Sequence, residues 1–412
     1  MKTRKQSVQI KTIHGYTVVL APCPIDTIAV RTVVRIGFIH ETIKNAGIHH
    51  LLEHVTVDGW KPCKLTCIQY WNKRGCVMNA TTGNTEVNYF VKGLPDMAEE
   101  MIQYISTIVT TPSLSEEVLR REKKAVISEL SMIMNSPKYA VSNAFNQSFY
   151  VQEGLQHMDD AQLQLKNVDS LTMSMLKEAH KLMYTPETVM FVVYGNFSVP
   201  VITKLMTSYL PMSTSVPPSP FDCFSYKHEL LYVHKDSPTV TVILGFPMKT
   251  LWNERGLYED VLRTILFEEL RTKYSLVYGI TVSINQDHCS SSLMVDFECL
   301  PDVFIKSLHV LFHRLMECTR TLIDKAILIG QQRKLIYLYH TKYDYDIYYS
   351  TYAYHKRAMY TKPQLIRKIQ ESTVQSFRSF MKEAIVFPQC TLAYQGKKNF
   401  HLDWEMFKID TQ

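Results

Sequence analysis

The sequence predicts an α+β protein with two structurally similar domains, each an antiparallel-dominated β-sheet with helices packed on it. Three observations support this fold class. Short alternations of apolar and polar residues, typical of strands, recur in both halves together with longer patterns of helical period. Their order in the first half returns in the second, although the residues themselves do not repeat. A proline- and serine-rich stretch at 211–221, which can continue neither a helix nor a central strand, separates the halves.

We therefore expect a first domain at 1–210, a linker at 211–221 and a second domain at 222–412. The length of 412 residues, with 46% hydrophobic and 20% charged residues, is sufficient for two independent cores.

The first half begins with strand patterns and continues with mixed helices and strands. In chain order we expect strands at 8–13, 16–20 and 28–36, a helix through 47–54, an amphipathic stretch at 65–73, strands at 77–81 and 86–91, two long helices of which the second covers 115–130, a helix at 169–183 and a strand at 189–194.

The second half follows the same order. We expect strands at 229–233 and 239–245, a helix at 254–270, strands at 277–284 and 291–297, two helices, a further helical pair and a final strand at 389–394.

Composition excludes several classes of protein. The net charge of +6 comes from basic residues interspersed with acidic ones, so we expect no nucleic-acid binding. No run of about eighteen apolar residues is present, and residues 1–5 lead directly into a strand pattern, so we expect no membrane association. Nine cysteines without Cys-x-x-Cys spacing indicate buried free thiols in a reducing compartment. We expect a cytoplasmic protein, with the mitochondrial matrix as the alternative for a chain whose presequence has been removed.

The chemistry is concentrated in one motif, His50-x-x-Glu53-His54. On a helix, residues four apart lie one above the other, so His50 and His54 can converge on one metal ion. Glu53 lies beside them and can take a proton from an attacking water and pass it to a leaving amine. This order is the inverzincin signature of zinc hydrolases. Alone, the pattern would arise by chance in roughly three such chains in a hundred.

A catalytic zinc ion needs a third protein ligand and one open position. The helix expected at 115–130 contains Glu122 and Glu129, which are two helical turns apart and share a face. Glu122 stands in a run of charged residues that could equally form a solvated helix surface.

With these residues together, the sequence resembles the pitrilysin or insulinase family of metallopeptidases, including its shorter, processing-peptidase-like members. The resemblance implies that Glu129, at the corresponding distance after His54, is the third zinc ligand and that Glu122 is an additional active-site carboxylate. The segment at 75–82 resembles the family's active-site edge strand, which implies that Asn79 and Ala80 contact bound peptide.

The segment at 267–279 resembles a family segment of the second domain that reaches the active site. This implies that Arg271 holds a backbone carbonyl of the substrate and that Tyr278 donates to the oxyanion of the tetrahedral intermediate. Without the resemblance, a solvent-facing arginine and a half-buried strand tyrosine would be the simpler interpretation. The second half lacks the histidine motif and cannot bind zinc in this way.

The expected function is that of a zinc-dependent endopeptidase acting on extended peptides or short unfolded segments. The resemblance implies a chamber formed by paired subunits, either a homodimer or a heterodimer with a paralogue that lacks the metal motif. Two alternatives belong to other classes: a non-catalytic or dormant structural subunit of the same fold that requires a partner, and a peptide-binding module with a regulatory metal.

Overall fold

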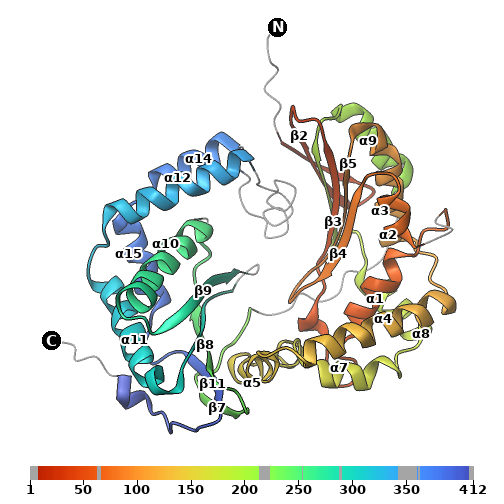
Figure 1. Cartoon of the computed structure of the whole chain (residues 1–412). Coiled ribbons are helices and arrows are strands. Elements are labelled where there is room, and N and C mark those ends of the chain that lie inside the picture. Colours follow the sequence, from red (N-terminus) through yellow and green to blue (C-terminus); the bar gives the residue numbers. More distant parts are fainter. Residues whose placement is uncertain are drawn as a thin grey trace. The chain divides into compact units, whose positions relative to one another are not determined.

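The chain forms two compact units in the computed structural model, which describes residues 8–62, 66–212, 223–252, 254–286, 290–341, 360 and 362–407 (Figure 1). Of these residues, the first unit contains those up to 134, those from 153 to 212, and residue 360. The second unit contains 135–152 and the remainder after 223. Most of the stretch expected as a linker lies outside the described residues, and the predicted domain limits stay a prediction.

A six-stranded sheet forms the centre of the first unit, in the order β1-β2-β6-β3-β5-β4. Only β2 and β6 are parallel neighbours; the other pairs are antiparallel. β4 is an edge strand that pairs with β5 alone within the described part of the chain. The strands are β1 (Gln9–Ile13), β2 (Tyr16–Pro22), β3 (Ile28–Val34), β4 (Val77–Thr82), β5 (Val87–Gly93) and β6 (Val189–Gly195).

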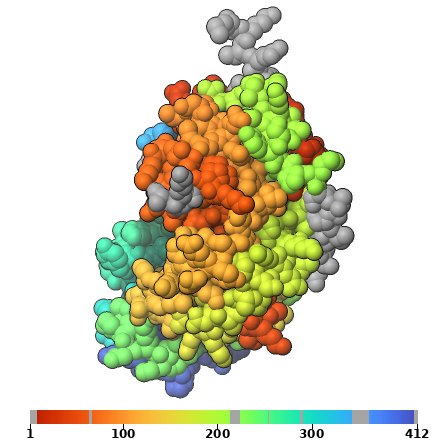
Figure 2. All heavy atoms as spheres, turned by 90° about the vertical axis from the view of Figure 1, so that its right-hand side faces the viewer, coloured from red at the N-terminus to blue at the C-terminus, as the bar shows by residue number. Residues whose placement is uncertain are grey.

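Helices cover one face of this sheet (Figure 1), and residues between 98 and 209 form much of the surface seen from that side (Figure 2). Amphipathic sequences account for this arrangement, because each helix buries its apolar face, as α1 does with Leu51, Leu52 and Val55. The helices are η1 (Phe38–His40), α1 (Ile48–Val57), α2 (Cys67–Asn72), η2 (Pro95–Met97), α3 (Ala98–Thr110), α4 (Glu116–Met134), α6 (Glu153–Gln156), α7 (Ala161–Val168), α8 (Met173–Met183) and α9 (Val199–Tyr209).

The second unit has a five-stranded sheet in the order β7-β11-β8-β10-β9, with β7 and β11 parallel and the other pairs antiparallel. Its strands are β7 (Leu230–His234), β8 (Val240–Met248), β9 (Val277–Gln286), β10 (Ser291–Cys299) and β11 (Thr391–Gly396). Its helices are α5 (Tyr139–Phe149), α10 (Arg255–Phe267), the π-helical turn η3 (Glu268–Lys273), η4 (Pro301–Val303), α11 (Phe304–Arg320), α12 (Lys325–Thr341), α14 (Lys362–Glu371), α15 (Val374–Ala384) and η5 (Trp404–Phe407).

The two sheets share one topology. The order β2-β6-β3-β5-β4 in the first unit matches β7-β11-β8-β10-β9 in the second, with the parallel pair in the same place. In both units a helix precedes the edge strand, α1 before β4 and α10 before β9. The predicted fold class, two similar α+β domains with mainly antiparallel sheets, is confirmed.

Helix α5 belongs to the second unit, although its residues fall within the range expected for the first domain. Its buried residues Val141, Phe145 and Phe149 pack on β7, β8 and β11 of the second unit. The close approach depends on Gly245, where an added Cβ would lie 2.6 Å from the ring of Phe145. Chain order alone does not determine which sheet buries an apolar helix face.

Two further expectations need adjustment. The helix expected at 254–270 ends as an α-helix at Phe267 and continues as the π-helical turn η3. Cys223 is disulfide-bonded, so the expectation that all nine cysteines are free thiols is wrong at this position. Among the described residues, no helix is both long and apolar enough to cross a membrane.

Candidate active site

Helix α1 places the two histidines of the motif. Its N-cap is Gly47, whose φ of 91° is the left-handed conformation that glycine adopts readily. The buried carboxylate of Glu41 accepts hydrogen bonds from the backbone N–H groups of Gly47, at 2.8 Å, and His49, at 2.9 Å. These bonds satisfy two amide groups that the first helical turn leaves unpaired. His49 itself is buried and does not line the cavity described below.

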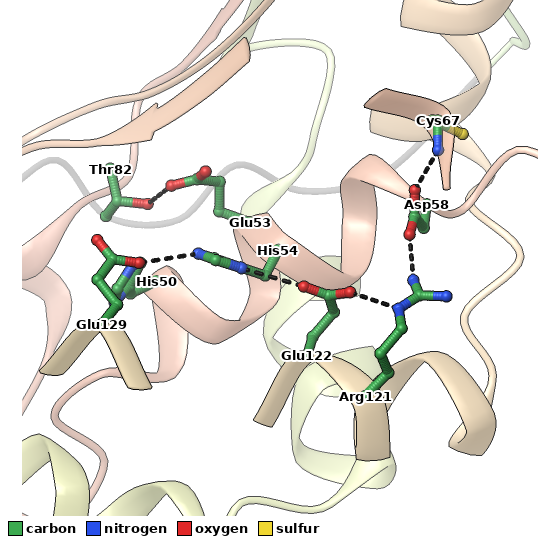
Figure 3. Close-up of polar contacts among 9 residues, drawn as sticks. All are labelled: His50, Glu53, His54, Asp58, Cys67, Thr82, Arg121, Glu122 and Glu129. Carbon is green, nitrogen blue, oxygen red and sulfur yellow. Dashed lines mark hydrogen bonds and ion pairs between the residues drawn. The ribbon is translucent and has the colours of Figure 1, made fainter. Parts of the chain in front are cut away.

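Three side chains from α1 and α4 converge in the first unit: His50, His54 and Glu129, whose candidate donor atoms lie within 4.8 Å of one another (Figure 3). Oε2 of Glu129 is 3.6 Å from Nε2 of His50 and 3.6 Å from Nε2 of His54. Zinc–ligand bonds of about 2.0–2.2 Å at a tetrahedral angle would place neighbouring donor atoms about 3.4 Å apart. The two imidazoles and the carboxylate therefore fit the first shell of a zinc ion.

Glu122 lies on the far side of His54 from this cluster. Its Oε2 is 3.2 Å from Nδ1 of His54, so a proton on Nδ1 leaves the Nε2 lone pair directed toward Glu129. Burial alone would lower the pKa of His54, but the carboxylates around it, with the Glu122 hydrogen bond first, raise it above its usual value. Burial likewise opposes ionisation of Glu122, yet hydrogen bonds from His54 and Arg121 lower its pKa.

The carboxylates of Glu129 and Glu53 differ in environment. The side chain of Glu129 is half exposed, and a hydrogen bond with His50 lowers its pKa despite partial burial. Glu53 is buried, and burial raises its pKa, opposed in part by its partners. Oγ1 of Thr82 on β4 donates a 2.7 Å hydrogen bond to Oε2 of Glu53. A raised pKa suits a group that must take up and release a proton.

A cavity of about 780 Å³ in the first unit brings these groups together with the edge strand. Its lining includes Asn79 and Ala80, the two residues expected to contact peptide. Ala80 and Thr82 lie on the same face of β4, whereas Asn79 is on the opposite face and exposed. Ile68, Met78 and Ile133 give part of the wall an apolar character.

Arg271 and Tyr278 lie beside each other in the second unit. Nη1 of Arg271 donates to the backbone oxygen of Val277 at 3.4 Å, and its guanidinium lies 5.2 Å from the centre of the Tyr278 ring. Tyr278, near the start of β9, is 84% exposed. Their participation in a site formed with the first unit stays a prediction.

Four residues at or near the site have no signal in the motif itself: Glu41, Asp58, Thr82 and Arg121. Glu41 bonds the backbone of His49, which is 8 residues away in the sequence, and Thr82 bonds Glu53, which is 29 residues away. Arg121 and Asp58 form an ion pair although they are 63 residues apart. Asp58 directly follows the helix of the motif, but a carboxylate cannot donate to the unpaired carbonyl groups at a helix C-terminus, so its position gave no signal of its contacts.

The family assignment follows from comparison with known proteins. Residues 17–158 match the family model described as insulinase (peptidase family M16), and residues 170–335 match the model described as the peptidase M16 inactive domain. The chain belongs to the insulinase family of peptidases. The resemblance inferred from the sequence is thereby confirmed.

Individual relatives are distant in sequence and close in fold. An uncharacterized zinc protease of Rickettsia bellii is 24% identical over 285 residues, which cover 65% of this chain and 67% of the relative. A probable mitochondrial-processing peptidase subunit beta of Schizosaccharomyces pombe is 23% identical over 198 residues, covering 48% of this chain and 43% of that protein. The crystal structure of a protease from Helicobacter pylori has a TM-score of 0.81 at 19% identity, over 95% of this chain and 99% of that chain.

Proposed function

We propose that this protein is a zinc-dependent endopeptidase that hydrolyses extended peptides or short unfolded segments. The convergence of His50, His54 and Glu129 at distances suited to zinc is the observation that carries the proposal. Family membership and the names of relatives, which are zinc proteases and a probable processing-peptidase subunit, support the same reaction class.

Zinc in this site would polarise the scissile carbonyl and make an attacking water more acidic. Glu53 is the general base of the proposal. Thr82 fixes one of its oxygens, which leaves Oε1 to accept the proton of the water. Because burial raises its pKa, the protonated Glu53 is a competent acid for the leaving amine in the next step.

The substrate would add as a strand to the open edge of β4, with backbone hydrogen bonds supplying much of the affinity. Side chains of Asn79 and Ala80 would border that strand, and the apolar wall of the cavity would accept a nonpolar side chain. This arrangement favours broad sequence tolerance over a fixed recognition code.

Arg271 and Tyr278 would complete the site from the second unit, the arginine on a substrate carbonyl and the phenol on the developing oxyanion. The exposure of Tyr278 supports this role, because a hydroxyl group free of burial can reach a bound substrate.

We further propose that the protein works as a homodimer or as a heterodimer with a paralogous subunit in the cytoplasm, with the mitochondrial matrix as the alternative. The similarity to a probable mitochondrial-processing peptidase subunit beta supports a partner.

The decisive experiment compares Glu53→Gln with Glu259→Gln. Both positions carry a helix carboxylate that accepts a hydrogen bond from the edge strand of its own unit. Glu53, which is buried, accepts from Thr82, and the partly buried Glu259 accepts from the backbone N–H of Ile284 at 2.6 Å. Loss of a general base lowers kcat by about 10²–10⁴-fold, so we expect that loss for Glu53→Gln alone, with zinc retained.

Cleavage of a quenched fluorescent peptide before and after chelation and zinc restoration provides the assay. Equal activities of the two variants would contradict the assignment of Glu53 as the general base. Zinc binding without any cleavage by the wild type would favour the second candidate, a dormant subunit that requires a partner. The absence of the histidine motif from the second unit, which matches a model described as an inactive domain, gives that candidate its support. A peptide-binding module would bind peptide equally well with or without Glu53.

A further inference from the structure

We propose that Arg121 and Asp58 are positioning residues for the zinc ligand His54 and act on it through Glu122. The inference rests on the proposed zinc site. It starts from a continuous series of polar contacts that leads from His54 through Glu122 and Arg121 to Asp58, at the C-terminal end of α1, and on to Cys67 (Figure 3).

The first part of the series concerns Glu122. Only its Oε2 faces Nδ1 of His54, and a glutamate side chain has several rotatable bonds that could carry this oxygen elsewhere. Nε of Arg121 donates to the other oxygen, Oε1, at 2.7 Å. The pair of contacts holds both oxygens of one carboxylate, so the orientation that His54 requires is fixed from the opposite side.

The second part concerns the remaining edge of the guanidinium. Nη2 of Arg121 donates to Oδ2 of Asp58, the C-cap residue of α1. The side chain of Asp58 is only 8% exposed, and its Oδ1 accepts a 2.6 Å hydrogen bond from the backbone N–H of Cys67, the first residue of α2. Asp58 therefore has both oxygens in use and cannot follow the arginine if it moves.

These contacts tie α4 to the C-terminal end of α1. The acids of the site, Glu122 and Glu129, belong to α4, whereas both imidazoles belong to α1. A planar guanidinium that joins the two helices next to the metal ligands fixes the register in which acids and imidazoles meet. We name these two residues, Arg121 and Asp58, the guanidinium clamp.

The competing interpretation is an ordinary surface ion pair. The side chain of Arg121 is 44% exposed, and pairs of that kind contribute little to stability. A surface pair would leave zinc affinity unchanged, whereas the clamp predicts a loss of zinc affinity that depends on Glu122. Metal affinity therefore separates the two interpretations without any reference to catalysis.

The test uses the full-length protein, freed of metal and titrated with Zn²⁺ in competition with a chromophoric chelator. Loss of contacts behind a ligating histidine typically lowers metal affinity by about 10–100-fold, and we expect about tenfold for Arg121→Ala. Asp58→Asn should weaken zinc binding in the same direction while its amide oxygen still accepts the Cys67 N–H, so this variant carries the test if Arg121→Ala does not fold. Arg120→Ala, an exposed neighbour on the same helix, is the matched control and should bind zinc like the wild type.

A double-mutant cycle gives the second measurement. In a Glu122→Gln background, Arg121→Ala should cause no further loss, because the carboxylate through which the clamp acts is already altered. Zinc affinity of Arg121→Ala within twofold of the wild type, or an equal loss with and without Glu122, would overturn the proposal. If the wild-type protein binds zinc but does not cleave peptide, the proposed peptidase function is overturned. The zinc titrations of the variants would still support or refute the guanidinium clamp.

Discussion

The two units solve the same packing problem with different chemistry. In the first, α1 and α4 meet through the imidazole and carboxylate cluster; in the second, the corresponding helices α10 and α12 meet through an ion pair in which Nζ of Lys334 lies 3.0 Å from Oδ2 of Asp260. Asp260 also pairs with Arg263 on its own helix. Each unit therefore has a polar link between these helices, and within the described residues the first unit makes that link from groups that could hold a metal ion.

One acid in each unit sharpens this comparison. Glu53 and the partly buried Glu259 both lie on the helix before the edge strand, and desolvation raises the pKa of each. Glu53 has two imidazoles nearby, whereas Glu259 bonds the backbone of β9 and has Arg255, Asp260 and Arg263 as its charged neighbours. A carboxyl group with a raised pKa is therefore a poor marker of catalysis on its own. The imidazoles beside it make the difference.

The largest expected effect comes from removing the distant ligand. Glu129→Gln should lower zinc affinity by more than about 100-fold, since loss of a contact behind a ligand already costs about 10–100-fold. Peptidase activity at limiting zinc should disappear with the metal. Chelator competition and peptide cleavage measure the two losses, and the exposed Glu117→Gln on the same helix should match the wild type. Retention of full zinc affinity by Glu129→Gln would break the contrast between the units.

The second prediction asks whether the units cooperate. Tyr278→Phe should lower kcat by about 10²–10³-fold, the usual consequence of losing an oxyanion donor. Zinc content and unfolding should stay unchanged, because the tyrosine ring is 84% exposed. Steady-state kinetics with parallel metal analysis provide the measurement. An unchanged kcat would contradict the proposal that Tyr278 of the second unit takes part in catalysis.

The third prediction concerns the start of α1, where the Glu41 side chain accepts two backbone hydrogen bonds. Helix α10 begins at Arg255, and its N-cap residue, Glu254, makes no side-chain capping hydrogen bond. Burial raises the pKa of Glu41 to about 7 from 4.5. A carboxyl group with a higher pKa in the folded state binds its proton more tightly there, so its ionisation lowers stability as pH rises from about 4.5 to about 7. Glutamine does not ionise.

Relative to Glu41→Gln, the metal-free wild type should therefore lose about 3 kcal/mol of unfolding free energy over that interval. Urea unfolding of both proteins at several pH values provides the test. A difference between them that does not vary with pH would show that Glu41 ionises normally.

The smallest effect is expected in the second unit. Lys334→Ala should cost less than about 1 kcal/mol, because the lysine side chain is 46% exposed and such pairs contribute little. Zinc affinity should be unaffected. Thermal unfolding and zinc titration together check this result, and any change in metal binding would contradict the separation of roles between the units.

Local spacing predicted only part of this site. Residues four apart, such as His50 and His54, and seven apart, such as Glu122 and Glu129, share a helix face because of the helical period. The expectation that Glu129 joins the two histidines came from the family resemblance. The repeated order of strands and helices could also be predicted, because strands and helices differ in the period at which apolar residues recur.

The unpredicted parts depend on packing between segments distant in sequence. Nothing in the neighbourhood of Arg121 indicates that its guanidinium reaches Asp58, and the Thr82–Glu53 bond requires the edge strand to pass α1 at one register. The placement of α5 on the second sheet depends on the space above Gly245, which no periodicity encodes. The exposure of Tyr278 was not predictable either, because the amphipathic pattern of its strand does not show which residues cover the ring.

The central claim is that two imidazoles and one carboxylate bind zinc in the first unit. X-ray absorption at the zinc edge of the purified protein tests it most directly, because the chain also contains free cysteine thiols that could compete as ligands. We expect one zinc per chain with nitrogen and oxygen neighbours at about 2.0–2.2 Å and a changed spectrum in Glu129→Gln. Sulfur neighbours at about 2.3 Å, or a protein that takes up no zinc, would contradict the account.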